Sequence, residues 1–306
     1  MLTPQIHADQ PSLPIIDTHI HMFDPTRPGG VPWPPKTDRI LYKPALPERY
    51  RSLTAKLGIV GAVVVEASPW LEDNQWVLNL AKDNPIIVGF VGDLEPDKLD
   101  FRRQFDRFHR NPLFRGIRYG NLWGRDLGES LNNPIFVEGL KLVADAGLEM
   151  DTANPDPKLI HVVVQLTDKI PSLRVVVDHL PGLKIPTDKA ARQKYEADLL
   201  ELGKRPRVYV KISQVPQRVN GAVSFELAHY RPLLDRLWDV FGADRLLYGS
   251  DWPNSDPWGS YDQILNLVRS YFAEKGTDAA EKYFWKNSVA AYRWVRRNSD
   301  QRPLPA

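Results

Sequence analysis

Cysteine is absent from this chain of 306 residues. Its absence excludes disulfides, thiolate metal sites and cysteine nucleophiles, so any bound metal must be held by nitrogen and oxygen ligands. An excess of charge of one sign is also lacking. The 40 Lys and Arg residues almost balance the 38 Asp and Glu residues, which leaves a formal net charge of +2. This balance gives no electrostatic reason to expect nucleic acid or a membrane surface as a partner.

Long apolar runs are missing as well. No stretch approaches transmembrane length, and the first residues lack the basic and apolar regions of a signal peptide. We therefore expect a soluble, cytoplasmic protein with a polar leader over residues 1–13. No Pro/Gly/Ser-rich linker divides the chain, so we expect a single domain over 1–306, and a homo-oligomer stays open.

Short β-branched runs recur along the chain, and most are followed by a loop and an amphipathic segment. Eight such runs are candidate strands: Ile15–His19, Gly61–Glu66, Ile86–Val91, Arg115–Arg118, Gly147–Asp151, Arg174–Asp178, Arg207–Ile212 and Arg245–Tyr248. Because each is apolar on both faces, they indicate a parallel sheet closed into an α/β (β/α)8 TIM barrel. An open doubly wound sheet is the alternative, but no Gly-x-Gly-x-x-Gly turn follows any strand.

One helix has clear start and stop signals. Asn133 is the expected N-cap, and Pro134 occupies the first helical position. The spacing places Phe136, Leu140 and Val143 on one face, and the helix is expected to stop at Gly147.

Two histidines end the first strand, separated by one residue. In an extended strand, residues i and i+2 project from the same face, so His19 and His21 should aim both imidazoles at one point. Asp17 is expected to share that face. Such a pair can begin a metal-binding or substrate-polarising site.

Polar residues also end two later strands. His179 follows the sixth strand, and Asp251 follows the eighth, with Gly249 leaving space beneath it. In a (β/α)8 barrel, chemistry lies at the C-terminal ends of the strands. Three imidazoles and one carboxylate are therefore expected to meet there, a set suited to a divalent cation or to activating water.

At these motifs the sequence resembles the amidohydrolase superfamily, which has His-x-His after strand one, a histidine after strand six and an aspartate after strand eight. It is most similar to the Amidohydrolase-2 branch, and within it to the sugar-acid lactonases and a pyrone-dicarboxylate lactonase. The matching segments are Ile16–Asp24, Arg115–Arg118, Val177–His179, Val210–Ser213 and Tyr248–Pro253. They extend over nearly the whole chain.

The resemblance implies a hydrolase that opens a lactone of a sugar acid or a related carboxylated ring. Strand five reads Leu148–Thr152 and lacks the histidine that the superfamily commonly uses for metal binding. The lactonase group similarly lacks it, and some members work without a metal. This departure favours a lactonase over the alternative, a metal-dependent decarboxylase of an aromatic or unsaturated acid. A barrel that only binds sugar acids is a third reading, disfavoured because binding needs no base.

Each candidate residue then has an expected role. Asp251 is the expected base, and His179 and Arg118 could polarise the carbonyl. Alternatively, one divalent cation, zinc or manganese, would do so. Its expected ligands are His19, His21 and Asp251, with Glu66 and His179 as further candidates.

Other residues are candidates for binding the substrate. Cationic groups near strands four and seven would imply an anionic small molecule; they are Arg118, Arg125, Lys211 and Arg218. Internal ion pairs are an equal alternative for Lys211. Aromatic rings in loops after strands could stack on a ring of the substrate or simply pack the loops together; they are Trp33, Trp70, Trp123, Trp252 and Trp258.

Overall fold

The structure, a computed structural model, describes residues 13–219 and 221–304. Eight parallel strands lie in one sheet, in the order β1-β2-β3-β4-β5-β6-β7-β10. Their bounds are β1 Ile15–Ile20, β2 Ile59–Val65, β3 Ile87–Gly92, β4 Phe114–Gly120, β5 Glu149–Ala153, β6 Arg174–Val177, β7 Val208–Ile212 and β10 Leu246–Tyr248. All eight predicted strands are therefore confirmed, each within two residues at either end. Of the predicted polar leader, residues 1–12 lie outside the described part of the chain.

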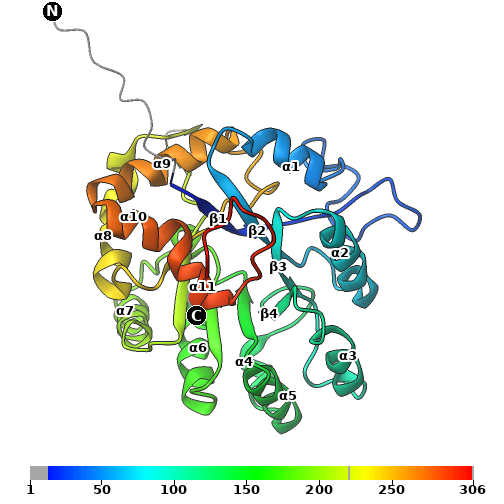
Figure 1. Cartoon of the computed structure of the whole chain (residues 1–306). Helices are drawn as coiled ribbons and strands as arrows, with labels where there is room; N and C mark the ends of the chain where they lie inside the picture. Colours follow the sequence, from blue (N-terminus) through cyan, green and yellow to red (C-terminus); the bar gives the residue numbers. More distant parts are fainter. Residues whose placement is uncertain (1–12, 220, 305–306) are drawn as a thin grey trace, which may run out of the picture.

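The sheet curves round until its first and last strands meet. Just beyond β10, the amide of Asp251 donates to the carbonyl oxygen of His19 (2.8 Å), and the amide of His21 donates to that of Trp252 (2.7 Å). Figure 1 shows the result, a ring of strands enclosed by helices. The chain thus folds as the predicted TIM barrel.

Helices follow the strands and cover the outside of the barrel. The α-helices are α1 Pro47–Thr54, α2 Leu71–Asp83, α3 Phe101–Phe108, α4 Leu127–Ser130, α5 Pro134–Asp145, α6 Pro157–Lys169, α7 Lys189–Gly203, α8 Leu227–Phe241, α9 Tyr261–Glu274, α10 Thr277–Glu281 and α11 Asn287–Tyr292. A 3-10 turn, η1 (Leu180–Gly182), follows β6, and a π-helical turn, η2 (Lys282–Lys286), precedes α11. Among the described helices, none is long and apolar enough to cross a lipid bilayer.

The predicted N-cap of α5 is confirmed. The Asn133 side chain accepts a hydrogen bond from the amide of Ile135 at 3.0 Å, and Pro134 opens the helix. The apolar face predicted for this helix is buried. Capping and amphipathic spacing are sufficient to define this element.

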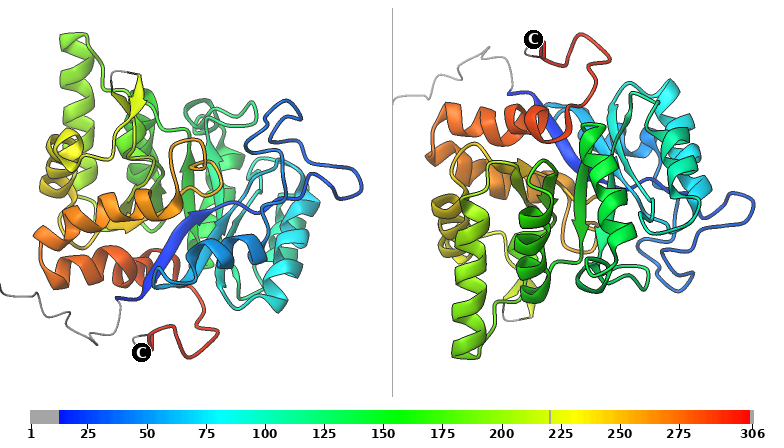
Figure 2. Two further views of the ribbon diagram at one scale, coloured as in Figure 1. Left: turned by 90° about the horizontal axis from the view of Figure 1, so that it is seen from above. Right: turned by 90° about the horizontal axis from the view of Figure 1, so that it is seen from below.

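The two ends of the barrel differ. After α11, the C-terminal segment crosses one end, where the Val295 amide donates to the Val88 carbonyl oxygen (2.9 Å) and the Gln301 amide group donates to that of Val60 (2.9 Å). Figure 2 shows this segment at the end opposite the small antiparallel hairpin β8 (Arg218–Val219) and β9 (Ala222–Val223). The hairpin follows β7, so the open end of the barrel is the C-terminal end of the strands.

Asp17 does not share a face with His19, and that prediction was wrong. Between Asp17 and Ile20 the register of β1 against β2 shifts, so β1 holds one residue more than its partner. A bulge of this kind reverses the alternation of side chains. The Asp17 carboxylate points outward, where it accepts hydrogen bonds from the hydroxyls of Tyr261 (2.8 Å) and Tyr50 (3.0 Å).

Candidate active site

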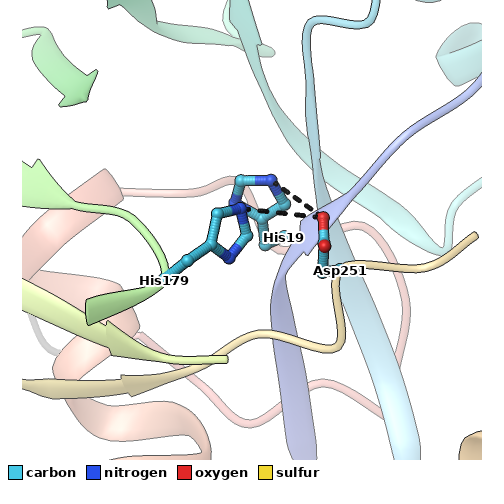
Figure 3. Close-up of side chains that lie close together, drawn as sticks. All are labelled: His19, His179 and Asp251. Atoms are coloured by element: carbon cyan, nitrogen blue, oxygen red, sulfur yellow. Dashed lines mark ion pairs between the residues drawn. The ribbon is translucent and has the colours of Figure 1, made fainter. Parts of the chain in front are cut away.

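Four side chains from three strand ends converge at the open end of the barrel. The Oδ1 atom of Asp251 lies 3.3 Å from Nε2 of His21, 3.6 Å from Nε2 of His19 and 3.7 Å from Nε2 of His179. All four residues are buried. Figure 3 shows His19, His179 and Asp251 pointing toward one another. The sequence-predicted set is thus brought together.

The backbone at these strand ends is strained in the same way. Five of the six described non-glycine residues with a positive φ lie just after barrel strands: Trp123, Asn154, His179, Gln214 and Asp251. They follow β4, β5, β6, β7 and β10, in that order. Left-handed backbone is unfavourable for L-residues with side chains, and such strain is concentrated at functional sites. This conformation turns the backbone sharply after each of these strands and holds the five side chains over the C-terminal end of the barrel.

Gly249 provides room for this arrangement. A Cβ atom at this position would lie 2.9 Å from the Cβ atom of His19. The absence of a side chain there lets β10 approach β1 closely, which places Asp251 beside the histidine pair.

Hydrogen bonds fix the tautomers of the histidine pair. The ammonium of Lys211 can only donate, and its Nζ atom lies 2.9 Å from Nδ1 of His19. Without a metal, this contact favours the His19 tautomer that carries its proton on Nε2, which lies 3.3 Å from Nε2 of His21. His21 in turn donates from Nδ1 to the carbonyl oxygen of Val65 at 3.0 Å. The chain of donors runs from Lys211 through both rings to the backbone.

The charge state of the site follows from burial and contacts. Burial raises the pKa of Asp251, but the neighbouring imidazoles, first that of His179, outweigh it and hold this pKa below its usual value. Burial lowers the pKa of His19 and of His179, and the charge of Lys211 lowers the pKa of His19 further. At neutral pH the site therefore combines an ionised carboxylate with neutral rings at these two positions.

Lys211 lies beneath the histidines and Asp251 and is fully buried. Its Nζ atom contacts the carboxylates of Asp151 and Asp178, the latter at 2.9 Å. The pKa of Lys211 is raised, because these carboxylates outweigh the effect of burial. Of the two readings predicted for Lys211, the structure places it in internal ion pairs, away from the cavity that the substrate would enter.

The two arginines near β4 are also paired inside the protein. Nε of Arg118 donates to Asp178 at 3.1 Å, and its Nη1 lies 3.7 Å from Glu66. Arg125 pairs with Asp93 and does not line the cavity. Glu66 was a candidate metal ligand, but in the structure its carboxylate accepts hydrogen bonds from Trp123 Nε1 (3.1 Å) and from the Ser68 amide.

Carboxyl groups outnumber cations in this buried network. Five carboxyl groups, those of Glu66, Asp93, Asp151, Asp178 and Asp251, face three cations, Arg118, Arg125 and Lys211. Three of the four cations expected to recognise an anionic substrate are thus already paired with carboxylates. Arg118 is the one of these three that also lines the cavity.

A large cavity, about 1180 Å³ in volume, opens above the four converging side chains. Trp33 and Trp123 line it, as does Trp258. Trp252 is fully buried against Tyr50, with ring centroids 5.3 Å apart, and Trp70 lies exposed outside the cavity. Arg218 stands over the Trp258 ring at 5.8 Å. The structure therefore places only some of the predicted aromatic residues where a ligand could meet them.

The four converging atoms fit a single divalent cation. Zinc bound at about 2.0–2.1 Å in a tetrahedron requires ligand atoms about 3.3 Å apart. Oδ1 of Asp251 lies 3.3 to 3.7 Å from the Nε2 atoms of the three histidines, and those of His19 and His21 lie 3.3 Å apart. Ligand atoms of His19, His179 and Asp251 all lie within 4.8 Å of one another. His21 has the tautomer that leaves Nε2 free to bind, because Nδ1 donates to the carbonyl oxygen of Val65. His19 would bind through Nε2 with its proton moved to Nδ1, which lies 3.4 Å from Oδ1 of Asp178.

A second possible cation site is already filled by a side chain. His19, Asp151 and Asp178 also bring three ligand atoms together. The ammonium of Lys211 contacts all three residues. Among the described residues, one group of possible ligands is therefore open to a metal ion, and the neighbouring group holds the ammonium of Lys211.

Family membership is decided by a family model for amidohydrolases, which matches residues 16–294. The chain belongs to the amidohydrolase family. Among curated relatives of this amidohydrolase, an L-fucono-1,5-lactonase from Burkholderia ambifaria is 27% identical over 292 residues, which cover 94% of this chain and 98% of the relative.

Solved structures share the fold of this amidohydrolase. An amidohydrolase from Burkholderia multivorans with bound zinc superimposes with a TM-score of 0.78 at 23% identity, covering 92% of this chain and 99% of that one. A candidate 2-pyrone-4,6-dicarboxylic acid hydrolase from Pseudomonas putida gives a TM-score of 0.71 at 22% identity, covering 92% and 98%. These likenesses confirm the barrel.

Several residues of the site were not predicted as site residues from the sequence. Gln214 donates to Oδ2 of Asp251 at 2.6 Å, and Asn254 donates to Oδ1 at 3.2 Å. Ser213 contacts Nδ1 of His179 at 2.7 Å. Ser213 and Gln214 directly follow β7, and Asn254 lies in the loop after β10, so the rule that chemistry follows barrel strands could have found them.

Proposed function

We propose that this amidohydrolase opens the lactone ring of a sugar acid or a related carboxylated ring. The observation that carries the proposal is the ionised carboxylate of Asp251, buried among three imidazoles beneath a large cavity. The L-fucono-1,5-lactonase relative, which aligns along nearly its whole length, supports the same reaction. Hydrolysis of a cyclic ester needs a base, a water and positive charge near the carbonyl oxygen.

Asp251 takes the proton of the attacking water in this proposal. Its Oδ1 atom faces the imidazoles, and Gln214 holds Oδ2 at 2.6 Å. The water oxygen bonds to the carbonyl carbon, and the bond from that carbon to the ring oxygen then breaks. The ring oxygen regains the proton from Asp251, so the product is an open hydroxy acid and the enzyme is restored.

Arg118 and His179 are the groups placed to stabilise the carbonyl oxygen as it becomes negative. Both line the cavity, and both are otherwise held in place, Arg118 by Asp178 and His179 by Ser213. Fixed donors of this kind stabilise developing charge without having to reorganise. Arg118 is also the contact expected for a carboxylate on the substrate.

Because its pKa is lowered, Asp251 is a weak base and works best on an acidified water. A divalent cation held by His19, His21, His179 and Asp251 would supply that acidity when bound. The protein residues orient the water and substrate with or without it.

The proposal is tested by measuring acid release from a panel of 1,4- and 1,5-lactones of sugar acids, alongside carbon dioxide release from aromatic and unsaturated carboxylic acids. Acid release from a lactone above the uncatalysed rate, without carbon dioxide, supports it. Carbon dioxide release without ring opening would instead establish a decarboxylase. Thermal stabilisation by sugar acids with no product of either kind would indicate a binding protein.

A further inference from the structure

The cavity above Asp251 has a second, apolar part that the proposed chemistry does not use. The loops after three consecutive barrel strands, β6, β7 and β10, supply most of this wall, and helix α8 supplies the rest. Its apolar side chains are those of Pro181, Leu183, Ile185, Pro216, Leu233 and Trp258. Polar groups also line the cavity: Lys184, Gln217 and His229 come from the same segments as the wall, whereas His21, Glu66, Arg118 and His179 belong to the buried network around Asp251.

The cavity is larger than a simple sugar-acid lactone needs. Pockets for drug-sized ligands measure roughly 300–1,000 Å³, and this one measures about 1180 Å³. A lactone ring seated against Asp251 would therefore leave the apolar wall uncovered. Ile185 and Trp258 are 38% and 37% exposed and both line the cavity, so their apolar surface is accessible to a ligand there.

The wall is held together by hydrogen bonds between its elements. Gln217 donates from Nε2 to the carbonyl oxygen of Pro181 (3.3 Å), which ties the loop after β7 to the loop after β6. The hydroxyl of Tyr230, on α8, accepts from the amide of Gln217 (3.0 Å) and donates to the carbonyl oxygen of Ser224 (2.6 Å). A wall that is formed in advance binds an apolar group without the cost of ordering it.

We infer that this apolar wall is a subsite for an alkyl or aryl substituent on the lactone. The substrate class is then a ring whose ester end is polar and whose far end carries an apolar group. The inference rests on the proposed function for the identity of the reacting ring. The preference of the wall itself can be measured by binding alone.

The experiment compares two lactones that differ in one alkyl chain, δ-valerolactone and δ-decalactone, on wild type and Trp258→Ala. Trp70→Ala is the matched control, because Trp70 is 42% exposed but lies outside the cavity. We expect kcat/KM to be at least about tenfold higher for δ-decalactone in the wild type and in Trp70→Ala, since each buried methylene is favourable. Trp258→Ala should lose most of that preference, with a much larger fall in kcat/KM for δ-decalactone than for δ-valerolactone.

Binding of the two ring-opened hydroxy acids, measured by calorimetry, separates this inference from the proposed function. If neither lactone is hydrolysed, tighter binding of the longer acid that depends on Trp258 still supports the subsite. Equal affinities for the two acids would overturn it, as would a loss in Trp258→Ala that is the same for both lactones. A change of oligomeric state in Trp258→Ala without a change in substrate preference would also overturn it, and would make the wall an interface between copies.

Discussion

The ammonium of Lys211 lies 2.9 Å from Nδ1 of His19, at the floor of the candidate site. This contact sets the His19 tautomer and thereby connects the buried charges on β5, β6 and β7 to the residues that would meet the substrate. The same ammonium forms ion pairs with Asp151 and Asp178, which are fully buried. One lysine therefore supports both the stability of the barrel and the arrangement of its site.

Lys211→Met should reduce both stability and activity. It removes the ammonium from two buried carboxylates and leaves Asp151 without a cation, whereas Asp178 keeps Arg118. Breaking a buried pair typically costs about 3–5 kcal/mol. It also frees the His19 ring, so we expect kcat to fall by at least about tenfold. Chemical denaturation and lactone hydrolysis measure the two effects. Lys194→Met, which removes an exposed partner of Asp198, is the control, and equal behaviour of the two variants would contradict this role.

Asp93 should make stability depend on pH. Burial raises the pKa of Asp93 from 3.8 to about 6, although Arg125 opposes the shift. The folded protein then holds this proton more tightly than the unfolded chain, so the stabilisation is complete below pH 3.8 and lost as the pH rises through 6. Relative to wild type, Asp93→Asn should gain stability between these pH values, by up to about 3 kcal/mol.

Urea unfolding at a series of pH values measures this dependence. Asp235→Asn provides a control of opposite sign, because hydrogen bonds from Lys275 and Tyr271 lower the pKa of Asp235. That variant should lose stability relative to wild type as the pH rises past the usual range of a carboxyl group. A flat difference between Asp93→Asn and wild type would show that Asp93 does not titrate in this window.

Metal binding should have a stoichiometry of one. The ligand atoms of three histidines lie within 3.7 Å of Oδ1 of Asp251, and Lys211 fills the neighbouring group of possible ligands. Calorimetric titration of chelator-treated protein with zinc should therefore give one equivalent, and zinc should raise the melting temperature. His179→Gln should weaken binding at least about tenfold. The partly exposed His161 is the control position, and two equivalents, or an unchanged affinity in His179→Gln, would contradict the assignment.

Arg118 should matter more for catalysis than Arg125. Both are paired with carboxylates, but only Arg118 lines the cavity. Arg118→Met should lower kcat/KM by a factor of about 100 or more, the typical cost of a lost oxyanion donor. The loss should be larger for lactones that carry a carboxylate than for those that do not. Equal losses in Arg118→Met and Arg125→Met would indicate that the two arginines act only through the buried network.

The sequence predicted the barrel and the convergence of His19, His21, His179 and Asp251, because both depend on local patterns. β-branched runs mark strands, and the ends of parallel strands meet at one edge. The side on which Asp17 lies depends instead on a bulge, which is set by pairing with β2 rather than by the alternation of β1 itself.

Ion pairs between residues far apart in the sequence could not be predicted either, because they too depend on which segments meet in the folded barrel. Lys211 could be read equally as a substrate contact or as an internal ion pair, because its partners are Asp151, 60 residues away, and Asp178. Trp252 follows a strand, as a ligand contact would, but packs between Arg49 and Tyr50 on the outer side. Strand ends can be predicted from local sequence, whereas the direction of each side chain there depends on its neighbours in space.

The most direct measurement compares the rate of acid release from sugar-acid lactones by wild type and Asp251→Asn. The control is Asp256→Asn, which changes a carboxylate in the same loop that pairs with Arg49 outside the cavity. Loss of a general base should lower kcat by a factor of about 100 to 10,000, with the fold unchanged by circular dichroism. Asp256→Asn should remain within a few-fold of wild type. Full activity in Asp251→Asn would contradict the proposed mechanism.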